Sequence, residues 1–127
     1  MIMAALYHKH LGIKYGFSIP VNVFGKGLSI AHIGPIVVNP ETRVGMNCRI
    51  HVCTNIGVAA DTHNGEPVLG DNIYIGPGAI LFGTITIADN MAIGVNAVVN
   101  KSFDSPGITI AGIPAKEIPD KGSFGLM

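Results

Sequence analysis

Residues 69–99 read LGDNIY, IGPGAI, LFGTIT, IADNMA, IGVNAV and a closing V, with a bulky aliphatic residue at every sixth position. An amphipathic helix repeats its apolar residues about every 3.6 positions, and a half-buried strand alternates them. A strict period of six fits neither pattern. It is typical of a solenoid in which six residues form one short strand and a corner, and three such units form one coil.

The same period extends through most of the chain. It predicts an all-β parallel β-helix of about four coils, in which each aliphatic side chain stacks on its equivalent one coil later. Glycine follows six of these residues, and we expect corners there whose backbone needs unusual torsion angles. The usual rule for parallel crossovers favours a right-handed coil. The twelve ladder positions are Phe24, Ile30, Val38, Val44, Ile50, Ile56, Leu69, Ile75, Leu81, Ile87, Ile93 and Val99.

Two irregular steps interrupt this ladder. From Ile30 the next ladder residue is Val38, a step of eight, and from Ile56 it is Leu69, a step of thirteen. The second step predicts an inserted loop at residues 57–68, because its Gly, Asn, Asp and Thr content suits an exposed excursion. Insertions into solenoids usually line the binding face.

The ends of the chain depart from the period. We expect an N-terminal cap or arm at residues 1–16, a β-helix at 17–104 whose ladder stops at Val99, and a C-terminal strand, cap and tail at 105–127. The N-terminus lacks the basic region of a secretion signal, and no apolar run approaches the length of a membrane span. We therefore expect a cytoplasmic protein without membrane insertion.

The amino-acid composition indicates what kind of core and surface the protein has. The 127 residues are 48 % hydrophobic but only 6 % aromatic, so the core must consist of Ile, Val, Leu and Ala, as a narrow solenoid requires. The formal charge is zero, which gives no basic surface for nucleic acid. A neutral, apolar surface favours burial in an oligomer.

Cysteine and paired histidine residues give no metal or disulfide signal. Cys48 and Cys53 are expected to be small core or corner residues. His8 and His10 form an HxH pair, but no further ligand follows at metal spacing, so we expect no metal site.

One column of residues could carry chemistry. His32, Val52, Pro77 and Val95 each lie two places after a ladder residue, so we expect them to stack on one outer face. This geometry suits a long ligand along the coil with a base at one end. A neutral imidazole can accept a proton at physiological pH, although His32 could also be a corner residue bonded to backbone.

Other polar residues lie near this column. His51 follows Ile50 and is either a corner residue or an acceptor contact. His63 and Glu66 lie in the inserted loop, which is either solvated or folded over the column. Lys101 and Lys116 lie just past the ladder, where they are ordinary surface lysines or point-charge phosphate binders.

Several motifs of residues 17–118 resemble a hexapeptide-repeat acyltransferase of the serine acetyltransferase type. They are AHIGPIVV, CRIHVCTNIG, IGPGAILFGTITIADNMAIGVNAVVNKS and AGIPAKEI. The resemblance implies a left-handed coil, a homotrimer with active sites between subunits, and acetyl transfer from acetyl-CoA to a small-molecule hydroxyl acceptor. His32 matches the histidine that deprotonates the acceptor. The positions that match the CoA groove are Pro77, Val95, Asn100, Lys101 and Lys116.

This chain departs from the family pattern around the acceptor. Ala31 stands where serine acetyltransferases have an aspartate before the histidine, a second aspartate position falls near Phe17, and Glu66 falls where a loop histidine is usual. In a serine-protease triad, loss of the carboxylate costs roughly 10⁴-fold in rate. The missing carboxylates would also weaken recognition of an amino acid's ammonium group, and the shorter layout resembles acetyltransferases of surface-polysaccharide synthesis. A saccharide acceptor is therefore our first expectation, and serine is the alternative.

Two other classes use the same solenoid. One alternative is a non-catalytic β-solenoid scaffold, for which the missing carboxylates are the best support. A γ-type carbonic anhydrase would hold zinc with three histidines, a spacing that this sequence lacks.

Overall fold

The computed structural model describes residues 2–60 and 65–127. These contain one helix, α1 (Ile2–Tyr15), and fourteen strands of two to four residues, as short as a six-residue unit requires. The strands are β1 (Phe17–Ser18), β2 (Ser29–Ile30), β3 (Ile36–Val38), β4 (Arg43–Val44), β5 (Arg49–Ile50), β6 (Thr54–Gly57), β7 (Val68–Leu69), β8 (Tyr74–Ile75), β9 (Ile80–Phe82), β10 (Thr86–Ile87), β11 (Ala92–Ile93), β12 (Val98–Val99), β13 (Thr109–Ala111) and β14 (Lys116–Ile118).

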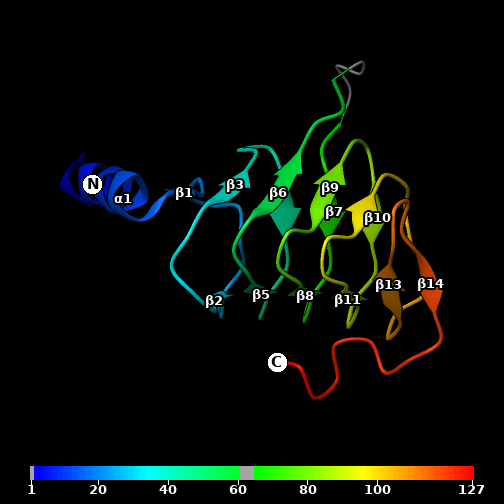
Figure 1. The fold of residues 1–127 in the computed structure, drawn as a ribbon. Coiled ribbons are helices and arrows are strands. Elements are labelled where there is room, and N and C mark those ends of the chain that lie inside the picture. Colours follow the sequence, from blue (N-terminus) through cyan, green and yellow to red (C-terminus); the bar gives the residue numbers. More distant parts are fainter. Residues whose placement is uncertain (1, 61–64) are drawn as a thin grey trace.

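The strands form three sheets that extend along the solenoid (Figure 1). Sheet A has the order β1-β3-β6-β9-β12, sheet B the order β10-β7-β4, and sheet C the order β14-β13-β11-β8-β5-β2. From β3 to β12, hydrogen-bonded neighbours are three strands apart in sequence, so the chain turns three corners in each coil. Pairing is parallel throughout except between β13 and β14. This is the predicted parallel β-helix.

The predicted stacking of the ladder is confirmed by the strand register. In sheet C, Ile50 pairs with Ile30 on one side and Ile75 on the other, and Ile75 pairs with Ile93. Ten of the twelve ladder side chains are buried, whereas Phe24 is half-buried and Ile30 is 36 % exposed at the open first coil. The corresponding rows are Val38, Ile56, Leu81 and Val99 in sheet A, and Phe24, Val44, Leu69 and Ile87 in sheet B.

The ladder continues beyond Val99, where we expected it to stop. Phe103 pairs with Ile87 and is buried, and Ile110 pairs with Ile93 and is fully buried. These two residues begin a fifth coil along sheets B and C, whereas sheet A ends at β12. Their steps of four and seven residues break the sixfold period in sequence, but hydrogen bonding to the coil below keeps them in register.

The corner torsions also differ from expectation. None of the six glycines that follow ladder residues has a positive φ. Five of them are needed because the coils approach closely: a Cβ on Gly76 would lie 2.8 Å from the carbonyl oxygen of Ile93, whereas the nearest atom to a Cβ on Gly57 would be 3.6 Å away. A left-handed backbone conformation is found instead at residues three positions after a ladder residue. Most of these are asparagine, which tolerates this conformation better than other non-glycine residues. Such residues are Asn47, Cys53, Asn72, Asn90 and Asn96, with φ between 56° and 62°.

Both irregular steps occur at corners of sheet A. The first lies between β2 and β3, where the chain enters this sheet. The insertion leaves sheet A after β6 and returns at β7 in sheet B, and within it residues 61–64 lie outside the described part.

Helix α1 projects from the first coil at the N-terminal end of the solenoid (Figure 1). None of its residues is buried, and it contacts the coil through β1. The His8 ring bonds the Ile19 carbonyl at 2.6 Å through Nε2. In the described part of the chain, no helix has the length and apolar content to span a bilayer.

Candidate active site

His32 lies on a bulge of the first coil. Ala31 is still in register, since its N–H bonds the Ile50 carbonyl at 3.1 Å, and Ile36 is back in register opposite Thr54. Ala31 is equivalent to His51, and Ile36 pairs with Thr54. Four residues lie between these two positions in the first coil, and only two in the second. The two extra residues therefore lie among residues 32–35.

This bulge changes the expected column. We predicted that His32 stacks on Val52, but the first-coil residue against Val52 is Gly34, where an added Cβ would lie 2.8 Å from Val52 Cγ1. Pro35 then accepts a bond of 2.6 Å from the Cys53 N–H. The sequence could not predict this packing. The eight-residue step from Ile30 to Val38 shows that two residues are extra, but not which two leave the column.

The His32 side chain is exposed beside a cavity of about 300 Å³ between the end of α1 and the first coil. Tyr15, Phe17, Ile30 and Ile33 line this cavity with it. No hydrogen bond joins the His32 ring to another residue of the described ranges 2–60 and 65–127. The ring can thus accept a proton from a molecule that enters the cavity, and none of the described residues fixes its orientation by a hydrogen bond.

The upper part of the column keeps the predicted order. The Gly78 N–H bonds the Val52 carbonyl at 3.0 Å, and the Asn96 N–H bonds the Pro77 carbonyl at 2.9 Å. Val52, Pro77 and Val95 thus follow one another at the corner between sheets C and A. Val95 is 64 % exposed, so this part of the corner presents apolar surface to solvent.

The lysine candidates lie at the far end of the solenoid. Lys101 is exposed, with Nζ 5.3 Å from the centroid of the Phe103 ring, and Asn100 beside it is also exposed. Lys116 is exposed in β14, and the preceding Ala115 bonds the Val98 carbonyl at 2.8 Å. Both lysines therefore lie near β12, the last strand of sheet A.

His51 is held at the same corner as Ala31, one coil further along. Its Nδ1 lies 2.8 Å from the Ile75 carbonyl oxygen, and its ring centroid lies 4.9 Å from that of Tyr74. The side chain is half-buried. From the sequence, His51 is either a corner residue or an acceptor contact, and the spacing does not decide between the two.

The loop candidates fall at a different corner. Glu66 is half-buried just before β7, at the corner between sheets A and B. His32 lies at the corner between sheets C and A, so the two residues are on opposite edges of sheet A. His63 lies outside the described residues.

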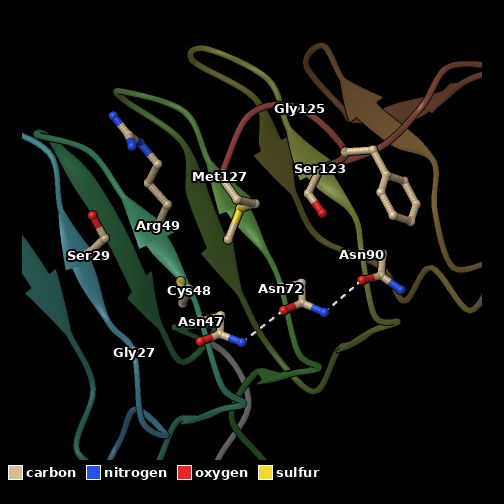
Figure 2. Close-up of a pocket in the computed structure, with 11 residues that line it drawn as sticks. Gly27, Ser29, Asn47, Cys48, Arg49, Asn72, Asn90, Ser123, Gly125 and Met127 are labelled. Atoms are coloured by element: carbon tan, nitrogen blue, oxygen red, sulfur yellow. Dashed lines mark hydrogen bonds between the residues drawn. The ribbon is translucent and has the colours of Figure 1, made fainter.

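Sequence analysis missed a second cavity, of about 470 Å³, beneath the C-terminal segment (Figure 2). Asn47, Asn72 and Asn90 line one side, joined by two side-chain hydrogen bonds. Ser123 crosses above them and bonds the Asn90 carbonyl through its N–H at 3.1 Å. The available signal was asparagine at the same place in GMNCRI, GDNIYI and ADNMAI.

The two cysteines are free thiols, one in the core and one at a corner, as expected. Burial raises the pKa of the Cys48 thiol to about 12, so it stays protonated. Among the described residues, no group of three or more His, Cys, Asp and Glu side chains could hold a metal ion.

The sixfold ladder, the three parallel sheets and the outer corner that carries the histidine define a hexapeptide-repeat β-helix. No protein-family model matches the chain. The chain is 34 % identical over 99 residues to serine acetyltransferase of Staphylococcus xylosus, which covers 77 % of this chain and 45 % of the relative. It is 35 % identical over 95 residues to serine acetyltransferase of Helicobacter pylori strain J99, which covers 74 % of this chain and 55 % of the relative.

Solved structures of serine acetyltransferases also match this chain. Soybean serine acetyltransferase matches with a TM-score of 0.81 and 27 % identity, over 91 % of this chain and 48 % of that one. The Neisseria gonorrhoeae serine acetyltransferase matches with a TM-score of 0.78 and 27 % identity, over 94 % of this chain and 46 % of that one. The chain spans about half the length of the relatives that it matches. It is a serine acetyltransferase-like hexapeptide-repeat protein with the left-handed coil that the resemblance implied.

Proposed function

We propose that the chain is an acetyl-CoA-dependent O-acetyltransferase in which His32 is the general base. The observation that carries this proposal is its likeness to serine acetyltransferases over three quarters of its length. One matching structure, from Brucella abortus, is a serine acetyltransferase in complex with coenzyme A; it has a TM-score of 0.74 and 29 % identity over 79 % of this chain and 40 % of that one.

In this mechanism the neutral His32 ring takes the proton of the acceptor hydroxyl as the oxygen attacks the thioester carbonyl. The new O–C bond forms, the C–S bond breaks, and the histidine returns the proton to the departing thiolate of CoA. Positioned general-base catalysis contributes roughly 10²- to 10⁴-fold. The exposure of His32 beside a cavity suits this role, because both reactants must reach the ring.

Acetyl-CoA is the proposed co-substrate, with Pro77, Val95, Asn100, Lys101 and Lys116 along its groove. The first and last coils are four strand spacings apart, or about 19 Å. A long thioester can span this distance, with its reactive end near His32 and its phosphates near the exposed lysines. Lysine binds phosphate as a point charge.

The acceptor is a small molecule with a hydroxyl group, and serine is now better supported than a saccharide. The relatives reported above are serine acetyltransferases, and a Neisseria gonorrhoeae structure in complex with serine matches with a TM-score of 0.67, 30 % identity and 76 % coverage of this chain. Our expectation of a saccharide rested on the missing carboxylates, at Ala31 and near Phe17, and on the resemblance of the shorter layout to polysaccharide acetyltransferases. His51, His63 and Glu66 remain the candidate acceptor contacts.

A homotrimer is the proposed assembly. Val37, Val68 and Ile80 point outward from sheets A and B and are 41–48 % exposed. Burial of such aliphatic side chains between subunits would remove apolar surface from water. Light scattering should give three times the chain mass of 13.2 kDa.

The test mixes the protein with acetyl-CoA and an acceptor, either L-serine, homoserine or a nucleotide sugar, and follows free CoA with a thiol reagent. We expect acceptor-dependent release with serine, and a loss of roughly 10²- to 10⁴-fold in kcat for His32→Ala. His10→Ala, on exposed α1, is the matched control and should retain full activity. No release with any acceptor contradicts the proposal and supports a scaffold. Release with a nucleotide sugar alone restores the saccharide acceptor.

A further inference from the structure

The imidazole of His51 takes part in the backbone hydrogen-bond ladder. At this place in the other coils, a main-chain N–H bonds the carbonyl one coil further on: Ala31 to Ile50 at 3.1 Å, and Gly76 to Ile93 at 2.8 Å. In the second coil, the bond to the Ile75 carbonyl comes from the His51 ring, at 2.8 Å. The ring is therefore tied to the scaffold.

This bond fixes the tautomer of the ring. A carbonyl oxygen can only accept, so Nδ1 must carry the proton, and in the neutral ring Nε2 then carries the lone pair. The Tyr74 ring, 4.9 Å away, restricts rotation of the imidazole. His51 thus presents a fixed hydrogen-bond acceptor at Nε2, whereas nothing among the described residues bonds the His32 ring.

The direction of Nε2 follows from the same bond. Nδ1 faces Ile75 in the third coil, and the two nitrogens diverge across the ring. Nε2 therefore faces away from the Ile75 carbonyl of the third coil. Ala31 lies at the same corner in the adjacent first coil, where its N–H bonds the Ile50 carbonyl, and His32 follows Ala31 directly.

We propose that His51 is a positioning residue whose Nε2 accepts a hydrogen bond from an amino group of the acceptor substrate. It supplies the acceptor atom that Ala31, which has no polar side chain, cannot supply. The substrate class is then a hydroxyl compound that carries an amino group beside the reacting hydroxyl. This inference rests on the proposed acetyl transfer at His32 and specifies what that site accepts.

The chain offers a matched pair of variants. His51→Asn keeps an amide N–H where Nδ1 is, so the bond to Ile75 can persist while Nε2 is lost. His51→Gln removes the Nδ1 bond but carries an amide group near the position of Nε2. The acceptors are also a pair, since 3-hydroxypropanoate is L-serine without its amino group.

For His51→Asn we expect kcat/KM for L-serine to fall roughly 10- to 100-fold, chiefly through KM, because a hydrogen bond to a charged group is lost. The value for 3-hydroxypropanoate should change less than threefold. The double variant Ala31→Asp/His51→Asn should recover serine selectivity. Equal losses on both acceptors, with an unchanged thermal midpoint, overturn the inference.

A second measurement needs neither turnover nor a folded variant. In the ¹⁵N spectrum of the wild-type protein, the neutral His51 ring should carry its proton on Nδ1, and L-serine should shift the Nε2 signal whereas 3-hydroxypropanoate should not. A proton on Nε2, or no response to serine, overturns the inference. A serine response without acetyl transfer supports this inference and contradicts the proposed function, so the two failures are distinguishable.

Discussion

The Asn72 side chain donates a hydrogen bond of 2.8 Å from Nδ2 to Oδ1 of Asn90, one coil further along the solenoid. Asn47 donates to Asn72 in the same way at 3.2 Å. All three residues adopt a left-handed backbone, with φ of 58°, 56° and 60° for Asn47, Asn72 and Asn90. Asparagine suits this corner twice: it tolerates the torsion, and its amide can accept from one coil while donating to the next.

Substitution of Asn72 should separate these two contributions. Asn72→Gly loses the amide bonds but keeps the torsion, and should lower the free energy of unfolding by about 1–2 kcal/mol. Asn72→Ala also strains the backbone and should cost about 1–2 kcal/mol more. Urea unfolding of the two variants, with exposed Asn55→Ala as control, measures both terms. Equal losses for alanine and glycine contradict the torsional part.

Glycine at the corners should matter for two different reasons. A Cβ on Gly70 would overlap the Asp89 carboxylate, which accepts a bond of 2.7 Å from the Asp71 N–H. Gly107 has open space around it but a φ of +75°. We expect Gly107→Ala to cost about 1 kcal/mol through backbone strain alone, and Gly70→Ala to cost at least twice as much through displacement of the carboxylate. Unfolding in urea gives both values, and the reverse order contradicts the steric explanation.

The two thiols should react at different stages. Cys53 is exposed and Cys48 is buried. We expect a disulfide reagent to label one thiol in the native protein and both in urea, because a protonated, buried thiol is a poor nucleophile. Cys53→Ser should abolish native labelling. Rapid native labelling of that variant would show that Cys48 is accessible.

Stability should fall in alkali because of Cys48. Its thiol has an ordinary pKa of 9.0, and burial raises the pKa to about 12 in the folded chain. Above pH 9 the unfolded chain releases a proton that the folded chain retains, so the stabilising contribution is complete below pH 9 and is lost as the pH rises toward 12. The slope is about 1.4 kcal/mol per pH unit. The wild type should show this loss relative to Cys48→Ala in urea titrations from pH 8 to 11. Parallel curves for the two proteins contradict it.

Much of the architecture follows from local pattern. The sixfold period predicts which residues stack, as the register of Ile50 with Ile75 shows, because each hexad builds the same strand and corner. The same pattern could not predict Phe103 and Ile110, since their spacing is irregular and hydrogen bonds to the coil below keep them in register. The glycines illustrate a further limit. Their positions were evident, but steric contact between coils rather than torsion explains five of the six that follow ladder residues.

The sequence by itself therefore determined the fold, the likeness to serine acetyltransferases and the candidate histidine. Repetition encodes these locally, and each hexad reinforces the next. Only the tertiary structure decided that Gly34 rather than His32 packs on Val52, and that the His51 ring is tied to Ile75. Both depend on contacts between residues 18 to 24 positions apart, whose geometry is set by how the coils stack and not by the residues on either side.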